Sequence, residues 1–279
     1  MADDLTVIVV ALLGGKALDR NVEAVRAQAR KLLVVQRDGM ITDSSGKKVG
    51  TAKRLDIPSK RQSATELAKT DLVALIEDTV IVGPQWAQAV ADALARKDAV
   101  ACGGPVRISS DLPAPARALA VSEYGGFAKE EPSALPGCNF AFRRDALLKA
   151  MKGSEGLVDQ KVFRALLKEG RLVWAHEMSV TYAEANRDGA RLKTRFDHGR
   201  IYGSAEAEHA GLPGRIVRAV KAVLLPPVMT VRSLRNAGPA ERRSLPTLGW
   251  LALQHTAWAA GELAGAIMGP SRKGLGQWQ

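Results

Sequence analysis

Two adjacent carboxylates, Glu77 and Asp78, directly follow an apolar run at residues 72–76 and precede Gly83-Pro84. The run is typical of a buried strand, so the two acids stand at its carboxyl end. Such a pair either keeps a strand end soluble or holds a cation, a sugar or a ribose at the mouth of a nucleotide pocket. The position before Gly83-Pro84 favours the second interpretation.

The elements that position these acids alternate along the first hundred residues. The segments with the composition of strands are 5–12, 32–36, 71–76 and 99–102, and those with helical spacing are 19–31, 61–69 and the stretch from Trp86. This alternation predicts βαβ units around a mainly parallel sheet. Because ligands of such sheets bind at the carboxyl ends of strands, Glu77 and Asp78 lie where a ligand is expected.

The pattern loosens after Gly104. Residues 135–150 are expected to form a loop, a short strand and a helix, and residues 159–169 a helix that ends at Gly170. Two short strands are expected at residues 171–175 and 179–183. Earlier in the chain, residues 38–50 are expected to form a loop or small hairpin.

The chain carries 40 Lys and Arg against 29 Asp and Glu, for a formal net charge of +11. Such a balance suits a polyanionic partner, which is a nucleic acid, an anionic membrane surface or a diphosphate substrate. Aromatic residues make up only 5% and no nucleic-acid-binding motif is present, so a nucleic-acid partner is not expected. Cys102 and Cys138 form neither a disulfide framework nor a zinc set, which predicts two buried thiols in a reducing compartment. The N-terminal residues are predicted to form a strand rather than a signal peptide.

The chain changes character at residue 212. Its next sixteen residues place five apolar side chains on one helical face and Arg215, Arg218 and Lys221 on the other, a pattern typical of a helix that lies in a membrane interface. Residues 212–243 contain seven Lys and Arg and one acid, Glu241. The alternative is an ordinary helix packed on the domain, with its basic face solvated.

Residues 245–269 are apolar and have roughly the length of a bilayer span. Gln254, His255 and Glu262 interrupt the segment, which argues against a membrane span. Ala257, Gly261 and Gly265 recur every four residues, a stripe suited to close helix packing.

Several stretches in a fixed order resemble the family 2 inverting glycosyltransferases of the GT-A type. They are LTVIVV, LVALIEDTVIVGPQW, ACGGPV, EYGGFA, LPGCNFAFRRDAL, EGLVDQKVFRALLKEG, RFDHGR and AWAAGELAG. The resemblance implies an α/β, GT-A-like Rossmann-type sandwich with a mainly parallel central sheet and a C-terminal helical tail. It also implies a nucleotide-diphospho-sugar donor in the N-terminal half, with the acceptor facing the second half.

The resemblance assigns roles to particular residues. Glu77 and Asp78 take the place of an Asp-x-Asp motif, and Asp78, with Glu77, is the metal candidate. Asp159 occupies the position of the catalytic base, although an aspartate there also suits a helix N-cap; Glu155 is the reserve. The remaining implied donor contacts are Asp38 after the second strand and Gly137 and Asn139 in the loop that faces the donor sugar.

Inverting transfer needs a carboxylate that takes the acceptor proton and positive charge that stabilises the departing diphosphate. Carboxylate-bound Mg²⁺ or Mn²⁺ commonly supplies part of that charge. Arg195, His198 and Arg200 would supply more, since guanidinium groups match phosphate oxygens. On this interpretation Asp78→Ala abolishes transfer and leaves the melting temperature nearly unchanged.

Three departures from the family pattern leave alternatives open. Gln36-Arg37-Asp38 replaces an aspartate pair, Ala183 stands where many relatives offer a metal ligand, and the Asp-x-Asp motif has one good match.

The first hypothesis is a hexosyltransferase that acts peripherally at the cytoplasmic face of the cell membrane, on a lipid-linked or envelope acceptor. The second is an inactive relative that binds a nucleotide or a partner protein, and the third and weakest is a nucleic-acid-binding protein. The expected domains are 1–210, catalytic, and 211–279, a helical extension.

Overall fold

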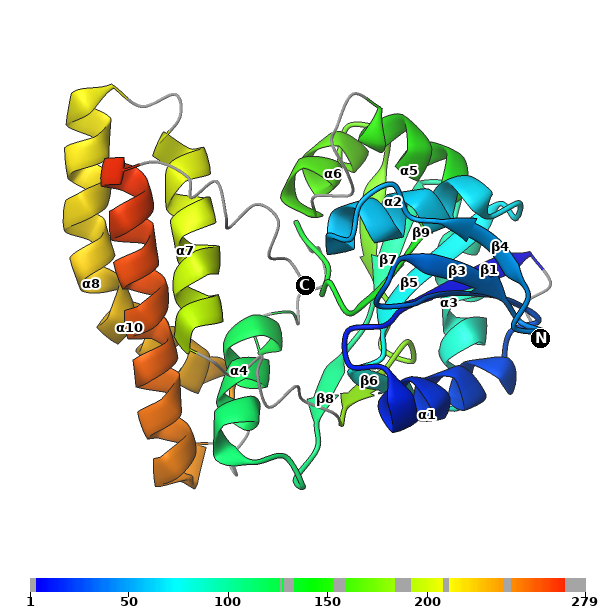
Figure 1. Ribbon diagram of the computed structural model, residues 1–279, viewed down its shortest axis with the longest axis horizontal. Helices are drawn as coiled ribbons and strands as arrows, with labels where there is room; N and C mark the ends of the chain where they lie inside the picture. Colours follow the sequence, from blue (N-terminus) through cyan, green and yellow to red (C-terminus); the bar gives the residue numbers. More distant parts are fainter. Residues whose placement is uncertain are drawn as a thin grey trace. The chain divides into compact units, whose positions relative to one another are not determined.

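The computed structural model describes residues 4–125, 127, 133–152, 159–183, 192–207, 211–237 and 242–268. They belong to two compact units. The first unit comprises Met1–Ser109 and Phe127–Glu184, and the second comprises Ser110–Gly126 and Ala185–Trp278. Both are shown in Figure 1.

The first unit is built on a large sheet with strand order β10-β7-β9-β5-β1-β2-β3-β4. The strands are β1 (Leu5–Val10), β2 (Lys31–Val35), β3 (Met40–Asp43), β4 (Lys48–Thr51), β5 (Leu72–Glu77), β7 (Ala99–Gly103), β9 (Asn139–Arg143) and β10 (Arg171–Trp174). The α/β class and the positions of the predicted strands are confirmed, and the predicted loop or hairpin at 38–50 is the β3–β4 hairpin.

The pairing within the sheet is mixed. Strand β1 is parallel to β2 and β5, and β10 is parallel to β7. Strand β9 runs antiparallel between β5 and β7, and the β3–β4 hairpin adds an antiparallel edge. The parallel centre that the alternating pattern predicted is therefore limited to β5, β1 and β2, and their carboxyl ends meet at one edge.

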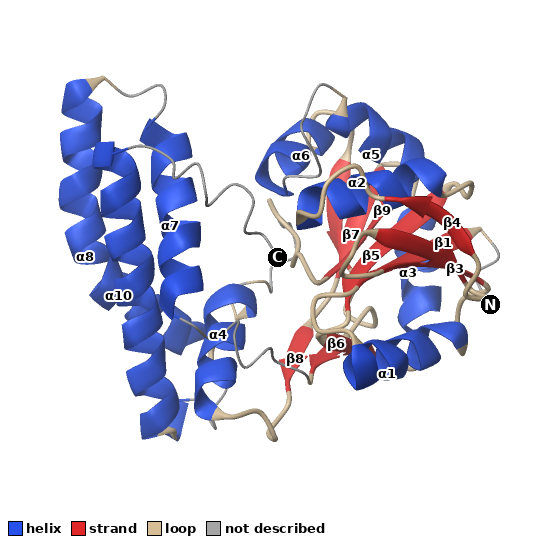
Figure 2. Cartoon of the chain, viewed as in Figure 1, coloured by secondary structure: helices blue, strands red, loops and turns tan. Residues whose placement is uncertain are grey.

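Helices cover both faces of this sheet (Figures 1 and 2). On one face lie α1 (Gly15–Arg26) and α3 (Trp86–Ala95), and on the other lie α2 (Ile57–Leu67), α5 (Arg144–Met151) and α6 (Asp159–Leu166). Every residue of β1 is buried, as expected of a strand covered on both sides. Cys102 and Cys138 are free cysteines and both are buried, which confirms the burial predicted for them, while the reducing compartment stays a prediction.

A small second sheet has the order β6-β11-β8. Its strands are β6 (Val80–Val82), β11 (Val180–Tyr182) and β8 (Val106–Ile108). Strand β6 follows β5 after two residues, so the turn that carries Asp78 and Thr79 joins the two sheets.

The described part of the second unit is helical (Figure 2). It contains α4 (Ala114–Tyr124), α7 (Leu192–Ala207), α8 (Leu212–Asn236) and α10 (Leu245–Met268). The predicted boundary at residue 210 falls between α7 and α8, but both helices pack against α10. The helical unit therefore begins earlier in the chain and also takes in the segment with α4.

Glycines let α7 and α10 approach closely. A Cβ atom on Gly261 would lie 2.0 Å from the carbonyl oxygen of Phe196, and one on Gly199 would lie 2.1 Å from that of Trp258. Gly203 and Gly265 repeat the arrangement one turn further on. The small-residue stripe predicted on 245–269 is thus a close helix contact, and α7 supplies a matching stripe.

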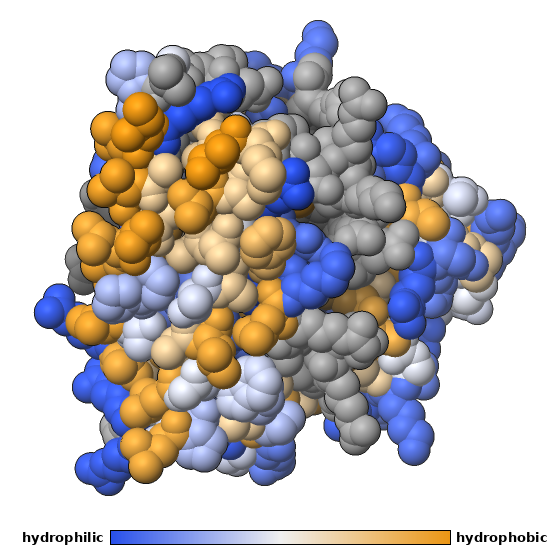
Figure 3. Space-filling model, turned by 60° about the vertical axis from the view of Figure 1, so that its left-hand side comes forward, coloured by the Kyte–Doolittle hydropathy of each residue, from blue (hydrophilic) through white to orange (hydrophobic). Residues whose placement is uncertain are grey.

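Helix α8 leaves large apolar side chains uncovered. Figure 3 shows hydrophobic side chains gathered on the face of the second unit that this helix forms. No described helix is both long and apolar enough to cross a membrane.

Candidate functional site

The carboxyl ends of β1, β2 and β5 bring together three short segments. They are the loop Leu12–Gly15 after β1, the turn Gln36–Gly39 after β2, and the turn Glu77–Thr79 after β5. Asn21 of α1 helps to hold the last of these, because its buried amide donates to the carbonyl oxygens of Glu77 and Val80.

Asp78 is buried beneath the loop after β1. Its carboxylate accepts backbone N–H groups from Leu12 at 2.9 Å, from Leu13 at 2.9 Å and from Gly14 at 2.7 Å. The loop can direct three successive N–H groups at one anion because Gly14 and Gly15 have φ angles of +72° and +53°. Burial raises the pKa of Asp78, and the backbone donors act in the opposite direction. Asp78 therefore fixes the shape of the loop.

Glu77 points to a different partner, Arg61 of α2. The Arg61 Nη2 atom lies 2.7 Å from Glu77 Oε1 and also donates to the Gly137 carbonyl at 2.6 Å. The guanidinium stacks over the Phe140 ring at 5.1 Å, and the Thr79 hydroxyl donates to the other Glu77 oxygen at 3.4 Å. This nearly buried ion pair thus ties α2 to the end of β5 and to the turn before β9.

Lys60, beside Arg61, is buried close to the turn after β2. Its ammonium donates to the Arg37 carbonyl at 2.9 Å. Burial lowers the pKa of Lys60, Arg37 lowers it further, and Asp38, Asp56 and Asp78 oppose the shift. Asp38 is exposed, and one of its oxygens accepts the N–H group of Met40 at 3.0 Å. A cation therefore lies within electrostatic range of two of the predicted donor-binding aspartates.

Asn139 is fully buried at the start of β9. Its amide donates to the carbonyls of Gly104 at 3.2 Å and Met178 at 2.8 Å, and its oxygen accepts the Trp86 indole N–H at 2.8 Å. These contacts join the two sheets to α3. Gly137, two residues earlier, is half-buried and contributes its carbonyl to Arg61. The structure gives Asn139 a packing role, and donor contacts by these two residues stay predictions.

The predicted base lies at the start of a helix. Asp159 is the first residue of α6, but its side chain is outside what the structure describes, and Glu155 lies outside the described residues altogether. The catalytic roles of both therefore stay predictions.

Arg195 lies inside the second unit. Its Nη1 atom is 2.9 Å from the Glu123 carboxylate of α4, and its guanidinium stacks over the Trp258 ring at 4.7 Å. The side chain of Arg195 is only 6% exposed. Burial raises the pKa of Glu123, while the Arg195 charge acts in the opposite direction. The pair ties α4, α7 and α10 together.

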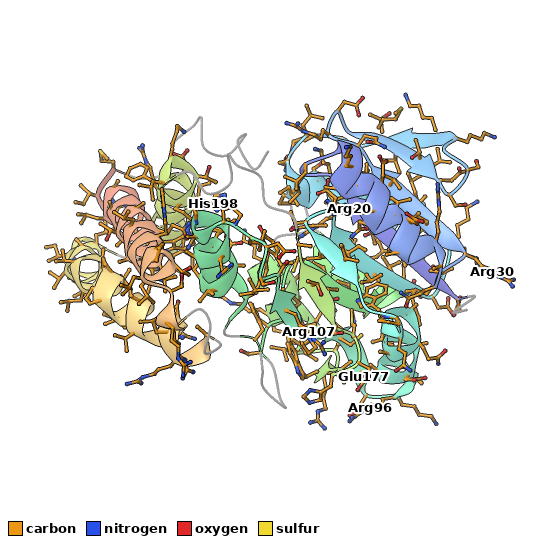
Figure 4. All side chains as sticks on the ribbon, turned by 90° about the horizontal axis from the view of Figure 1, so that it is seen from below. Arg20, Arg30, Arg96, Arg107, Glu177 and His198 are labelled. Carbon is orange, nitrogen blue, oxygen red and sulfur yellow. The ribbon has the colours of Figure 1, made fainter. Side chains whose placement is uncertain are left out.

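His198 is one turn further along α7 and lies among the helices of the second unit (Figure 4). Burial, and to a lesser degree the Arg195 charge, lowers its pKa to about 4. It is therefore a neutral ring at physiological pH. Arg200 is half-buried on the same helix. That these α7 residues bind a donor diphosphate stays a prediction.

Sequence reasoning missed Lys60 and Arg61. The signal that would have found them is helical spacing, because Lys60, Arg61, Ala64 and Thr65 all fall on the buried face of α2. A charged residue on a buried face needs a partner, and an acid at a nearby strand end is an obvious one.

The predicted metal pair has other partners. Among the described residues, no group of three or more His, Cys, Asp or Glu side chains is arranged to hold a metal ion. The Asp78 oxygens accept backbone N–H groups and Glu77 pairs with Arg61, so neither carboxylate is arranged as a metal ligand. These residues do not fit a metal ion in this arrangement, and we assign no chemical step to one.

No protein-family model and no curated protein matches the sequence. Among solved structures, one match is the mannosyltransferase PcManGT from Pyrobaculum calidifontis in complex with GDP-Man and Mn²⁺. It has a TM-score of 0.51 and 13% identity, over 98% of this chain and 77% of that one. Another is GalNAc-T7 with UDP, GalNAc and Mn²⁺, with a TM-score of 0.50 and 13% identity, over 74% of this chain and 51% of that one.

Both neighbours are glycosyltransferases with the GT-A fold, and the likeness extends over most of this chain. At 13% identity it establishes architecture alone. The chain has the mixed α/β architecture of the GT-A glycosyltransferases, together with C-terminal helices.

Proposed function

We propose that this protein is a glycosyltransferase that takes a sugar from a nucleotide-diphospho-sugar with inversion. One observation carries the proposal: on a GT-A fold, Asp38, Lys60, Arg61 and Glu77 converge with the Asp78-braced loop at the carboxyl ends of β1, β2 and β5. This edge is where open α/β sheets bind nucleotides.

The contacts of these residues suit each of them to a different role in donor binding or transfer. Exposed Asp38 is the group best suited to a ribose or base, because its carboxylate retains acceptor positions beyond the single Met40 bond. Lys60 and Arg61 supply positive charge beside a departing diphosphate. Asp78 holds the loop after β1 and acts as a positioning residue. Asp159, at the start of α6, takes the acceptor proton.

The acceptor in this proposal is lipid-linked or belongs to the cell envelope. The basic second unit, with its exposed apolar helix, suits a substrate held at a membrane.

A donor screen tests the proposal. Melting temperature is measured with UDP-, GDP- and dTDP-sugars, with and without Mn²⁺, and release of nucleoside diphosphate is then followed for any sugar that stabilises the protein. We expect at least one donor to raise the melting temperature and to be hydrolysed or transferred. Asp159→Asn should lower the rate by about 10²–10⁴-fold with little change in donor affinity. Full activity in that variant would remove Asp159 from the mechanism.

A second candidate is an inactive relative that binds a nucleotide. The observation in its favour is that Glu77 and Asp78 are already engaged with Arg61 and with the loop after β1. Donor-dependent stabilisation without any turnover, with every acceptor preparation tried, would select this candidate.

A further inference from the structure

Helix α8 presents its large apolar side chains to solvent. Ile216, Val217, Val220, Val223, Leu224, Val228 and Val231 are between 49% and 67% exposed. At 3.6 residues per turn these seven positions fall on one face, which we call the α8 strip. The hydrophobic side chains gathered in Figure 3 follow this face.

The other face of α8 packs on the helices through small side chains. Ala222 and Ser233 are buried, and the Ser233 hydroxyl lies 3.1 Å from Nε2 of His255 on α10. A helix of a soluble bundle normally does the reverse, burying its large apolar residues and exposing polar ones. The α8 strip is therefore a surface that packing within the second unit does not use.

Positive charge borders the strip. Lys221, Arg232 and Arg235 are exposed on α8, and exposed Arg242 and Arg243 precede α10. The sequence from Leu212 to Ala237 contains no acidic residue. An apolar strip bordered by a large excess of positive charge, seven Lys and Arg against the single acid Glu241 in residues 212–243, is complementary to a surface that offers hydrocarbon and phosphate together.

We propose that the α8 strip docks on an anionic lipid surface and lies in the interface. Apolar side chains enter the boundary between headgroups and acyl chains, and the bordering Lys and Arg contact lipid phosphates. The proposal is independent of donor chemistry, because it rests only on residues of the second unit.

The border charges also argue against a second copy of this chain as the occupant. A symmetric dimer through the α8 strip would place Lys221, Arg232 and Arg235 near the same cations of the partner. Like charges brought together at an interface cost binding energy, whereas lipid phosphates neutralise them.

Co-sedimentation of the full chain with vesicles tests the proposal. One set is phosphatidylglycerol mixed with phosphatidylcholine, and the other is phosphatidylcholine alone. We expect sedimentation with the anionic set, much less with the neutral set, and weaker binding as salt rises, since charges are screened beyond about 8 Å at physiological ionic strength.

Two triple variants separate the apolar and basic contributions. Val220→Ser, Val223→Ser and Leu224→Ser together should weaken binding at least about tenfold, by removing buried apolar area. Lys221→Glu, Arg232→Glu and Arg235→Glu together should weaken it at least about 100-fold, because each cation near an anionic surface contributes roughly fivefold in affinity.

Matched controls lie in the first unit. Val49→Ser, Leu55→Ser and Leu67→Ser change three exposed apolar residues, and Lys31→Glu, Lys48→Glu and Lys69→Glu change the net charge by the same amount. Both controls should bind vesicles as the unchanged protein does, and melting curves of all four variants confirm folding.

Two results would overturn the proposal. One is equal binding to neutral and anionic vesicles that neither α8 variant alters. The other is a two-chain mass by light scattering that the Val220, Val223 and Leu224 variant returns to one chain, without vesicle binding, which would make a second copy the occupant. Neither result bears on donor binding, which is measured without lipid.

Discussion

Asp78→Ala is expected to destabilise the first unit as well as to disturb donor binding. The change removes the carboxylate that accepts the N–H groups of Leu12, Leu13 and Gly14. A buried donor left without an acceptor costs about 1–3 kcal/mol. We take the low end for each of the three donors, about 3 kcal/mol in total, because the loop is half-buried and water can reach it.

A loss of that size should lower the melting temperature of the first unit by about 6–12 °C, since that unit falls in the range of about 150–250 residues to which this conversion applies. Unfolding followed by circular dichroism measures it. Asp19→Ala, at an exposed position of α1, is the matched control and should change stability by no more than about 0.5 kcal/mol. Asp78→Asn should fall between the two, because its amide keeps one acceptor oxygen and turns a nitrogen toward the remaining donors.

The sequence-based expectation of an unchanged melting temperature for Asp78→Ala is therefore replaced. If the melting temperature of Asp78→Ala stays within the range of the Asp19→Ala control, the backbone contacts of Asp78 do not hold the loop, and the structural role assigned to it is refuted.

Three further predictions concern packing and charge. Gly261→Ala should lower the free energy of unfolding, measured by chemical denaturation, by at least about 2 kcal/mol, because the new Cβ would meet the backbone of α7. As the control, Gly249→Ala on the same helix would place its Cβ where nothing lies within 4 Å, so that change should be neutral or stabilising. Arg61→Met should lower the free energy of unfolding by about 3–5 kcal/mol, because it removes the cation that balances the nearly buried Glu77 charge. Adding Glu77→Gln should recover a large part of that loss, and purely additive losses would argue against coupling between the two residues. Burial lowers the pKa of His255 to about 4. Its contribution to stability is therefore complete above the unfolded-state pKa near 6.5 and falls by about 1.4 kcal/mol per pH unit down to about pH 4. His255→Gln should flatten that slope in acid titration, and a slope equal to that of the unchanged protein would contradict the assignment.

The sequence predicted the position of Glu77 and Asp78 well but not their partners. An apolar run followed by acids marks a strand end from local pattern alone. The contacts join residues distant in the chain: Arg61 lies 16 positions before Glu77, and Leu12 lies 66 before Asp78. Such pairs depend on the order of strands in the sheet, which periodicity does not encode.

Asn139 illustrates a related difficulty. A polar residue in a loop-to-strand segment suggests a ligand contact, but this amide is buried beneath Trp86 and joins the two sheets. Strand β9 enters between β5 and β7 from more than thirty residues downstream of β7, so its neighbours, and hence the partners of Asn139, follow from tertiary packing.

The boundary between the two units could be predicted only in part from the sequence. The spacing of Gly261 and Gly265 predicts a packing stripe on α10, but it does not reveal the complementary glycines of α7, Gly199 and Gly203. Matching the two spacings would have moved α7 into the helical unit.

Calorimetric titration with nucleoside diphosphates and their sugars tests the central claim most directly. We expect at least one of the UDP, GDP or dTDP series to bind with one-to-one stoichiometry. Asp38→Ala should weaken that binding without lowering the melting temperature, because Asp38 is exposed, and Asp19→Ala should leave it unchanged. Absence of binding by every member of the panel, or binding that Asp38→Ala does not alter, would contradict a donor site at the carboxyl ends of β1, β2 and β5.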